Sequence, residues 1–178
     1  MSGKYKLIIG LGNPGEDYQN TYHNVGKSMI DYLSELMSDQ KPNFKKVKTF
    51  EFLKTPQGIL VKPLVFMNES GKAIQDLIRF FDSNPEEILI VHDDSDLEIG
   101  TYKLKKNQNA AGHHGIESII EKLKTKNFWR LRIGIRPKLE NKKRAKAETF
   151  VLKKISRLDQ SKLYGVFGET MEKLTEKV

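Results

Sequence analysis

The side chains best suited to move a proton lie in two polar clusters that are far apart along the chain. The first cluster contains His23, and the second is the run HDDSD at residues 92–96, which follows a short apolar stretch. An imidazole can take a proton from water near neutral pH when a neighbouring group fixes its tautomer. A carboxylate at the end of a central strand can do this, so His23 and Asp93 form a candidate catalytic pair.

Both clusters also have a simpler interpretation. A single histidine in a loop before a helix is often a surface or capping residue. Asp93, Asp94 and Asp96 can be ligands of Mg²⁺, because hard cations prefer carboxylate oxygens, or they can form a turn that is rich in aspartate. The residue types leave these alternatives open.

Two asparagines are candidates for contacts with a substrate. Asn68, in the segment FMNESG, can cap the helix that follows, or it can donate to a carbonyl oxygen or oxyanion. Asn13 lies in the loop GLGNPG, which has the G-x-G-x-x-G spacing of dinucleotide sites. Such sites also need the third glycine inside a helix and an acidic residue at the end of the next strand. Here Asp31 falls on a predicted helix, which favours a tight turn and leaves Asn13 unexplained.

The residue types exclude several other chemistries. The chain has no cysteine, so disulfides and thiolate catalysis are excluded, and a metal would need His, Asp or Glu ligands. There is no G-x-S-x-G motif to indicate a serine nucleophile. His113 and His114 are neighbours that point apart on a helix, so they make a poor chelate. This pair alone therefore does not indicate a metal site.

Strands and helices are predicted to alternate along the chain. Apolar runs and turn signals predict strands at 6–10, 48–53, 59–63, 88–91, 101–105 and 131–135, and helical periodicity predicts helices at 25–37, 69–81, 116–123 and from about 158. This order is typical of an α/β fold: a single domain over residues 1–178, built as a three-layer sandwich with a twisted mixed β-sheet flanked by helices. The polar clusters follow strands, where the sites of such folds gather.

The net charge of +8 is concentrated in the second half of the chain. Residues 1–89 contain 11 basic and 11 acidic side chains, whereas residues 99–162 contain 18 and 5. An electropositive face suits a nucleic-acid partner, although a solvated lysine-rich surface gives the same count. Glycine and proline break the first apolar run too early for a signal peptide or membrane span, so we expect a cytoplasmic protein with no membrane partner.

Seven segments taken together resemble the bacterial peptidyl-tRNA hydrolases. In order, they are GLGNPG, YQNTYHNVG, KPLVFMNESG, VHDDSDLEIG, GHHGIESI, FWRLRIGIRP and FVL. The resemblance covers nearly the whole chain, and several motifs in order are more specific than any one of them. It implies a single-domain α/β enzyme, usually a monomer, that hydrolyses the ester between a peptide and the 3′-terminal ribose of tRNA without metal or cofactor.

The resemblance also implies roles for individual residues. His23 corresponds to the general base of the family, and Asp93 corresponds to the carboxylate that orients it. The residues implied to bind the substrate are Asn13, Tyr18, Phe66, Asn68 and His114, and those implied to bind a tRNA phosphate are Lys105 and Arg132.

The chain departs from the family pattern close to these residues. Tyr22 stands where the family usually has arginine, His114 replaces an asparagine, and residues 106–111 (KNQNAA) replace a glycine-rich loop. These changes leave a second hypothesis, a protein of the same fold that binds RNA with weakened or lost activity. The presence of His23 and Asp93 favours the enzyme.

Overall fold

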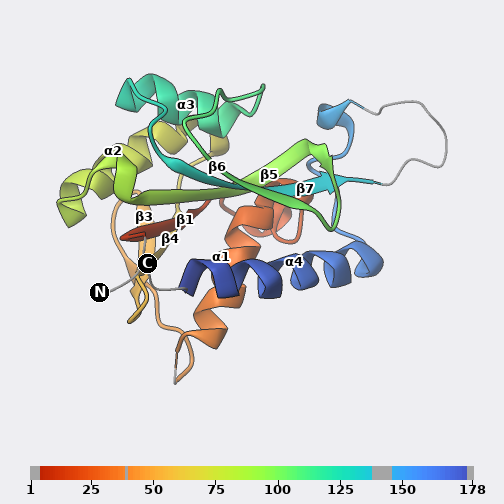
Figure 1. Cartoon of the computed structure of the whole chain (residues 1–178), viewed down its shortest axis with the longest axis horizontal. Helices are drawn as coiled ribbons and strands as arrows, with labels where there is room; N and C mark the ends of the chain where they lie inside the picture. The colour runs from red at the N-terminus through yellow and green to blue at the C-terminus, as the bar shows by residue number, and fades with distance from the viewer. Residues whose placement is uncertain (1–4, 39, 138–145, 176–178) are drawn as a thin grey trace.

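A seven-stranded sheet forms the centre of the protein. The computed structural model describes residues 5–38, 40–137 and 146–175, and within them the strand order is β2-β3-β4-β1-β5-β7-β6 (Figure 1). The strands are β1 (Leu7–Gly10), β2 (Lys45–Lys46), β3 (Phe50–Lys54), β4 (Ile59–Pro63), β5 (Ile88–Glu98), β6 (Tyr102–Lys106) and β7 (Trp129–Arg136). Strands β4, β1, β5 and β7 are parallel, and the others are added by antiparallel pairing, so the sheet is mixed as predicted.

Two pairs of helices cover the sheet. Helices α1 (Val25–Leu36) and α4 (Arg157–Thr175) lie on one face, and α2 (Ser70–Phe81) and α3 (His114–Leu123) lie on the other (Figure 1). Alternate side chains of the buried strand β1 enter the two cores between these layers. The predicted three-layer α/β fold is thereby confirmed. None of the helices that the structure describes is long and apolar enough to cross a membrane.

The predicted elements agree with the observed ones to within a few residues, with one extension. The segments on either side of residues 55–58 form the predicted hairpin of β3 and β4. Strand β5 is longer than the apolar run 88–91, because it continues through the HDDSD run to Glu98. Most of the polar loop expected at 138–146 lies outside the described residues.

Two local interpretations are settled by the backbone. Gly15 is exposed, has φ of +97°, and precedes the 3₁₀ turn η1 (Glu16–Tyr18) rather than lying inside a helix, so the loop after β1 lacks the geometry of a dinucleotide site. Asn68 lies in the 3₁₀ turn η3 (Met67–Glu69), and α2 has Glu69 at its N-cap position. The prediction that Asn68 caps α2 is therefore wrong, because an extra turn intervenes.

Two glycines allow α1 to approach the sheet closely. A Cβ built on Gly26 would lie 2.4 Å from the carbonyl oxygen of Val91, and one built on Gly10 would lie 2.2 Å from the carbonyl oxygen of Gly26. These oxygens belong to the backbone and cannot rotate away as a flexible side chain would. The start of α1, with His23 just before it, is thereby placed against the middle of β5, where Asp93 lies.

The segment before α4 holds the loop that carries His23. The amide N–H groups of Tyr22 and His23 donate to the carbonyl oxygens of Lys153 (3.2 Å) and Val151 (2.8 Å). The hydroxyl of Tyr22 donates to the carboxylate of Asp159 in α4 at 2.7 Å. The residue that replaces the usual arginine therefore ties this loop to α4.

Replacement of Gly26 by alanine tests the close approach of α1. The new methyl group would meet a backbone carbonyl, so Gly26→Ala should lower the free energy of unfolding by about 1–3 kcal/mol, as overpacking does in a core. Urea denaturation followed by circular dichroism measures this change.

Gly165→Ala in α4 is the matched control, because nothing lies within 4 Å of a Cβ built on Gly165. This variant should be as stable as the parent or up to about 1 kcal/mol more stable, since alanine is the better helix former. Equal effects of the two substitutions would contradict the packing argument.

Candidate active site

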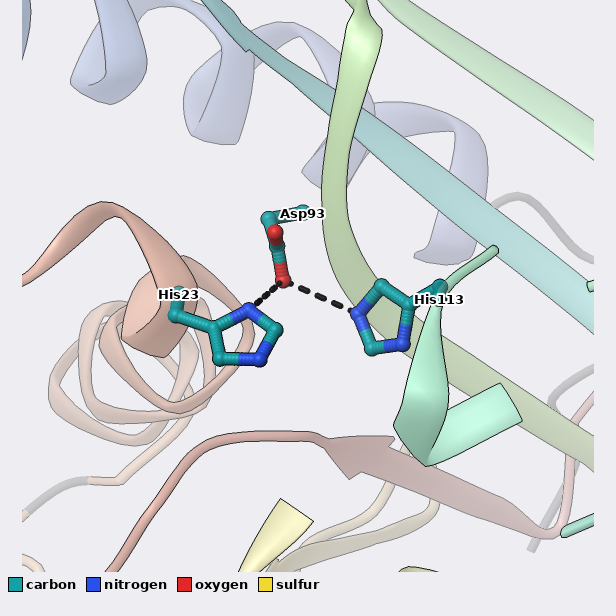
Figure 2. A group of neighbouring side chains, drawn as sticks. All are labelled: His23, Asp93 and His113. Carbon is teal, nitrogen blue, oxygen red and sulfur yellow. Dashed lines mark hydrogen bonds and ion pairs between the residues drawn. The ribbon is translucent and has the colours of Figure 1, made fainter. Parts of the chain in front are cut away.

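His23 and Asp93 meet at the carboxyl end of the central strands. His23 lies in the 3₁₀ turn η2 (Tyr22–Asn24), and its Nδ1 is 2.9 Å from Oδ1 of Asp93 (Figure 2). The side chain of Asp93 is 4% exposed and that of His23 is 15% exposed. The structure thus brings together the two residues that the sequence predicts to be a pair.

A second imidazole shares the same carboxylate oxygen. Nε2 of His113, the residue immediately before α3, lies 3.0 Å from Oδ1 of Asp93. The rings of His23 and His113 flank this oxygen, and their centroids are 5.2 Å apart (Figure 2). Asp93 therefore joins the loop before α1 to the start of α3, across the edge of the sheet.

The hydrogen bonds indicate the tautomer of each ring. An ionised carboxylate only accepts, so His23 donates from Nδ1 and His113 donates from Nε2. Nδ1 of His113 accepts the amide N–H of Ile116 at 3.3 Å and caps α3. Nδ1 of His113 is therefore occupied by this cap. Nε2 of His23 is the ring nitrogen that is left to act as a base.

Asp93 controls the protonation of His23. Burial alone would lower the pKa of His23, but the charge and hydrogen bond of Asp93 outweigh burial and raise that pKa above its ordinary value. Burial alone would raise the pKa of Asp93, yet His113 and His23 hold it well below its ordinary value. Asp93 thus remains ionised throughout the pH range in which His23 titrates.

A third histidine is buried behind this group. His92 is 2% exposed, and its Nδ1 donates to the backbone carbonyl oxygen of Asp93 at 2.7 Å. Its ring packs edge-on against His113, with centroids 4.6 Å apart. Burial, with smaller contributions from His113 and Arg130, holds the pKa of His92 well below its ordinary value. His92 is therefore a neutral group that supports His113.

The histidines and Asp93 also have the composition of a metal site. Within the described parts of the chain, the ligand atoms of His23, Asp93 and His113 form a group in which all lie within 4.8 Å of one another. A metal on Nε2 of His113 would require a proton on Nδ1, because ligating histidines normally donate from their other nitrogen. The N–H of Ile116 already occupies that position, so this ring is poorly prepared to be a ligand.

The three aspartates of the HDDSD run have different partners and do not form a magnesium site. Asp94 accepts from Nε of Arg132 and from the amide N–H of Asp96. Asp96 is exposed, and its carboxylate lies 3.8 Å from Arg136. Asp93 is engaged by the two imidazoles, so the Mg²⁺ interpretation of the three carboxylates is wrong.

The predicted substrate contacts lie on elements that are joined to one another. Oδ1 of the buried Asn13 accepts the amide N–H of Met67 at 2.8 Å, which links the loop after β1 to η3. Asn68 is the next residue of η3 and is exposed. Tyr18 and Phe66 pack edge to face with centroids 6.1 Å apart, and Phe66 is half exposed. Two amides and an aromatic pair are therefore brought to neighbouring loops.

Three predicted residues remain, of which two line the pocket of His23 and one does not. His114 and Arg132 line the same pocket as His23, which has a volume of about 140 Å³. His114 is largely exposed and its Nδ1 is 3.0 Å from Glu117 of its own helix. Lys105 is exposed on β6 and does not line this pocket.

His113 is the site residue that the sequence analysis did not assign. The prediction that His113 and His114 point apart is confirmed, since one contacts Asp93 and the other is exposed. The residue before a helix is usually Ser, Thr, Asp or Asn. A histidine before a predicted helix is therefore the local signal that could have indicated a further role.

The fold and site define an α/β protein in which a carboxylate orients an imidazole, the arrangement of a general base. The sequence model of the family described as peptidyl-tRNA hydrolase matches residues 7–178. The chain belongs to this family.

Individual relatives agree with this assignment. The peptidyl-tRNA hydrolase of Mycoplasma mycoides subsp. mycoides is 46% identical over 132 residues, which cover 73% of this chain and 71% of the relative. That of Mycoplasmopsis pulmonis is 38% identical over 172 residues, which cover 95% and 88%. The crystal structure of peptidyl-tRNA hydrolase from Acinetobacter baumannii is 30% identical, with a TM-score of 0.83 over 98% of this chain and 88% of that one.

An NMR titration of the histidine side chains tests the shared carboxylate. The pKa of His23 should lie above the ordinary value of about 6.5 and should fall in Asp93→Asn, because the charge is lost while the burial remains. His113→Asn keeps a good N-cap but removes one donor from Asp93, so it should raise the pKa of His23. The same pKa of His23 in all three proteins would contradict this geometry.

Proposed function

We propose that this protein hydrolyses peptidyl-tRNA with His23 as the general base and Asp93 as the group that orients it. Membership of the peptidyl-tRNA hydrolase family provides the reaction, in which the ester between peptide and tRNA is cleaved and free tRNA is released for reuse in translation. The roles are supported by the 2.9 Å contact between Nδ1 of His23 and Oδ1 of Asp93, which leaves Nε2 of His23 as the base.

In this mechanism His23 acts twice. Its Nε2 takes a proton from water while the water oxygen attacks the carbonyl carbon of the ester, and the ionised Asp93 stabilises the imidazolium that forms. When the tetrahedral intermediate breaks down, the bond from this carbon to the ribose oxygen breaks. The ribose oxygen takes the proton from Nε2, which yields a peptide with a free carboxyl group, tRNA with a free hydroxyl and neutral His23.

The amides and aromatic rings supply the contacts to the acyl part of the substrate. Because Oδ1 of Asn13 is occupied by the N–H of Met67, its Nδ2 group is the part that can donate to a substrate oxygen. Asn68 is exposed and does not cap α2, so its amide can stabilise the oxygen on which negative charge develops. Tyr18 and Phe66 offer an apolar surface beside them.

The edge formed by β6 and β7 supplies the contact to tRNA. Lys103 lies opposite Arg132 and Lys105 lies opposite Arg130, so these four side chains start from one face of the sheet. Arg132 uses Nε for Asp94, which leaves its terminal nitrogens for a phosphate. We assign Lys105 and Arg132 to the binding of a tRNA phosphate. Because Arg132 also lines the pocket of His23, the acceptor end of the tRNA would enter the pocket from the side of Arg132.

The alternative of an inactive RNA-binding protein has no support in the part of the chain that the structure describes. Tyr22, one of the departures that motivated it, bonds to Asp159 and leaves the contact of His23 with Asp93 intact. His114, another departure, lies at the rim of the pocket and can still contact the substrate.

The proposal also covers the domain organisation, oligomeric state, cellular location and cofactor requirement of the enzyme. We expect the 178 residues to act as one domain and as a monomer in the cytoplasm, where tRNA is recycled. We also expect activity without a metal or cofactor, because the proton transfers above use only His23, water and the substrate.

Loss of the base should slow turnover strongly. His23→Ala should lower the rate of tRNA release from a peptidyl-tRNA by about 10²–10⁴-fold, the range for removal of a general base. The assay follows free tRNA on acid gels, with and without EDTA, and EDTA should not change the rate of the unmodified enzyme. The variant should still bind tRNA. Near-normal cleavage by His23→Ala would eliminate this mechanism.

The phosphate contact predicts a change in salt dependence. Lys105→Ala should weaken tRNA binding and lower the slope of log affinity against log salt concentration by about 1. Binding can be measured by fluorescence anisotropy across a series of salt concentrations. Lys48→Ala, an exposed lysine outside β6 and β7, is the control and should keep the parent slope. If both variants behave alike, Lys105 does not bind the phosphate.

A further inference from the structure

A second groove adjoins the site on the other side of Asn13. It has a volume of about 390 Å³ and lies between the loop after β1, the start of α1, and strands β3 and β4. Asn13 lines this groove but not the pocket of His23. Four charged side chains line it as well: Lys27, Asp31, Glu51 and Lys62. The proposed mechanism does not use any of them.

The two lysines of this groove have different partners. Nζ of Lys62 is 2.7 Å from Asp31 and 2.9 Å from Glu51, so two carboxylates hold it. Nζ of Lys27 donates to the backbone carbonyl oxygen of Asn13 at 3.2 Å. In the described residues, no carboxylate forms an ion pair with Lys27. Its amine is therefore held by a neutral acceptor.

The stem of Lys27 is fixed by close packing. A Cβ built on Gly12 would lie 3.0 Å from Cδ of Lys27 and 2.9 Å from the amide carbon of Asn24. The absence of a side chain at Gly12 therefore makes room for the lysine stem. Packing therefore restricts the amine of Lys27 to one position at the wall of the groove, beside Asn13. The amine of an exposed lysine, in contrast, moves freely in solvent.

These surroundings affect the charge of the amine. Burial lowers the pKa of Lys27 to about 8; Glu51 and Asp31 oppose this shift, and Lys62 adds to it. For Lys62, burial alone would lower the pKa, but the bonds to Asp31 and Glu51 raise it above its ordinary value. Near neutral pH a larger share of Lys27 amines is therefore neutral than of ordinary lysine amines.

We propose that Lys27 is a covalent acylation site for small activated acyl donors, of which acyl phosphates are the simplest, bound in the groove beside Asn13. The lone pair of Nζ attacks the carbonyl carbon of the donor. The bond from this carbon to the phosphate oxygen breaks, the phosphate leaves with the electron pair, and Nζ releases a proton to water. The products are an acyl-lysine amide and inorganic phosphate.

Acylation changes both the charge and the shape of this wall. The amide nitrogen keeps one N–H for the carbonyl oxygen of Asn13, but the positive charge is lost and the acyl group occupies part of the groove. Because Asn13 is a proposed substrate contact, the modification places new bulk next to the site without touching His23 or Asp93.

Treatment of the unmodified protein with acetyl phosphate tests the proposal. Peptide mapping by mass spectrometry gives the acetylation rate of each lysine. At pH 7.4 the rate at Lys27 should exceed that at the exposed Lys54 by roughly 10-fold, because the gain in neutral amine is partly offset by the lower nucleophilicity of a weaker base. Lys62, in the same groove but held by two carboxylates, should react more slowly than Lys54.

The pH dependence separates a reactive amine from simple accessibility. The rate at Lys27 should level off once the pH passes about 8–9, whereas the rate at Lys54 should keep rising towards pH 10. Acetylation of Lys27 no faster than of Lys54 at pH 7.4, or rates that rise in parallel to pH 10, would overturn the proposal. The mapping requires no substrate, so either result leaves the proposed hydrolysis unaffected.

Discussion

The site depends on one buried carboxylate that accepts hydrogen bonds from two imidazoles. Asp93 is only 3% exposed, and a buried charge is unfavourable unless donors surround it. His23 and His113 provide these donors from opposite sides (Figure 2). Since both rings bond to one oxygen and His113 is also held by Ile116, the orientation of His23 depends on the position of α3 as well as on β5.

Backbone contacts bring these groups together. Gly26 allows α1 to lie against the middle of β5, and the segment that contains Val151 fixes the loop of His23 through the amide of His23. On the opposite face, the cap of α3 fixes His113. The supports come from parts of the chain that are distant in sequence, and none of them takes part in proton transfer. In the FVL motif, Val151 holds this loop through its backbone carbonyl, and the ring of Phe150 packs edge-on against Tyr22 of the same loop.

Local patterns of sequence were sufficient for most of the fold, because strands and helices here follow hydrophobic periodicity. The pairing of His23 with Asp93 was also predictable, since each lies next to a strand end or helix start where α/β sites gather. The role of His113 was not predictable, because it depends on a contact between the residue that caps α3 and the distant strand β5. The cap assigned to Asn68 failed because a 3₁₀ turn precedes α2. Lys27 lies on a helix, and only tertiary packing shows that it is half-buried beside Gly12 and Asn13.

The central claim is that Asp93 selects the tautomers of its two neighbouring rings. Two-bond ¹H–¹⁵N correlation spectra of the histidine rings, recorded above the pKa of His23, measure the tautomers directly. The structure predicts a proton on Nδ1 of His23 and on Nε2 of His113, with the opposite nitrogens unprotonated. A proton on Nε2 of His23 would contradict the account, because the nitrogen assigned as the base would then have no lone pair to accept a proton from water.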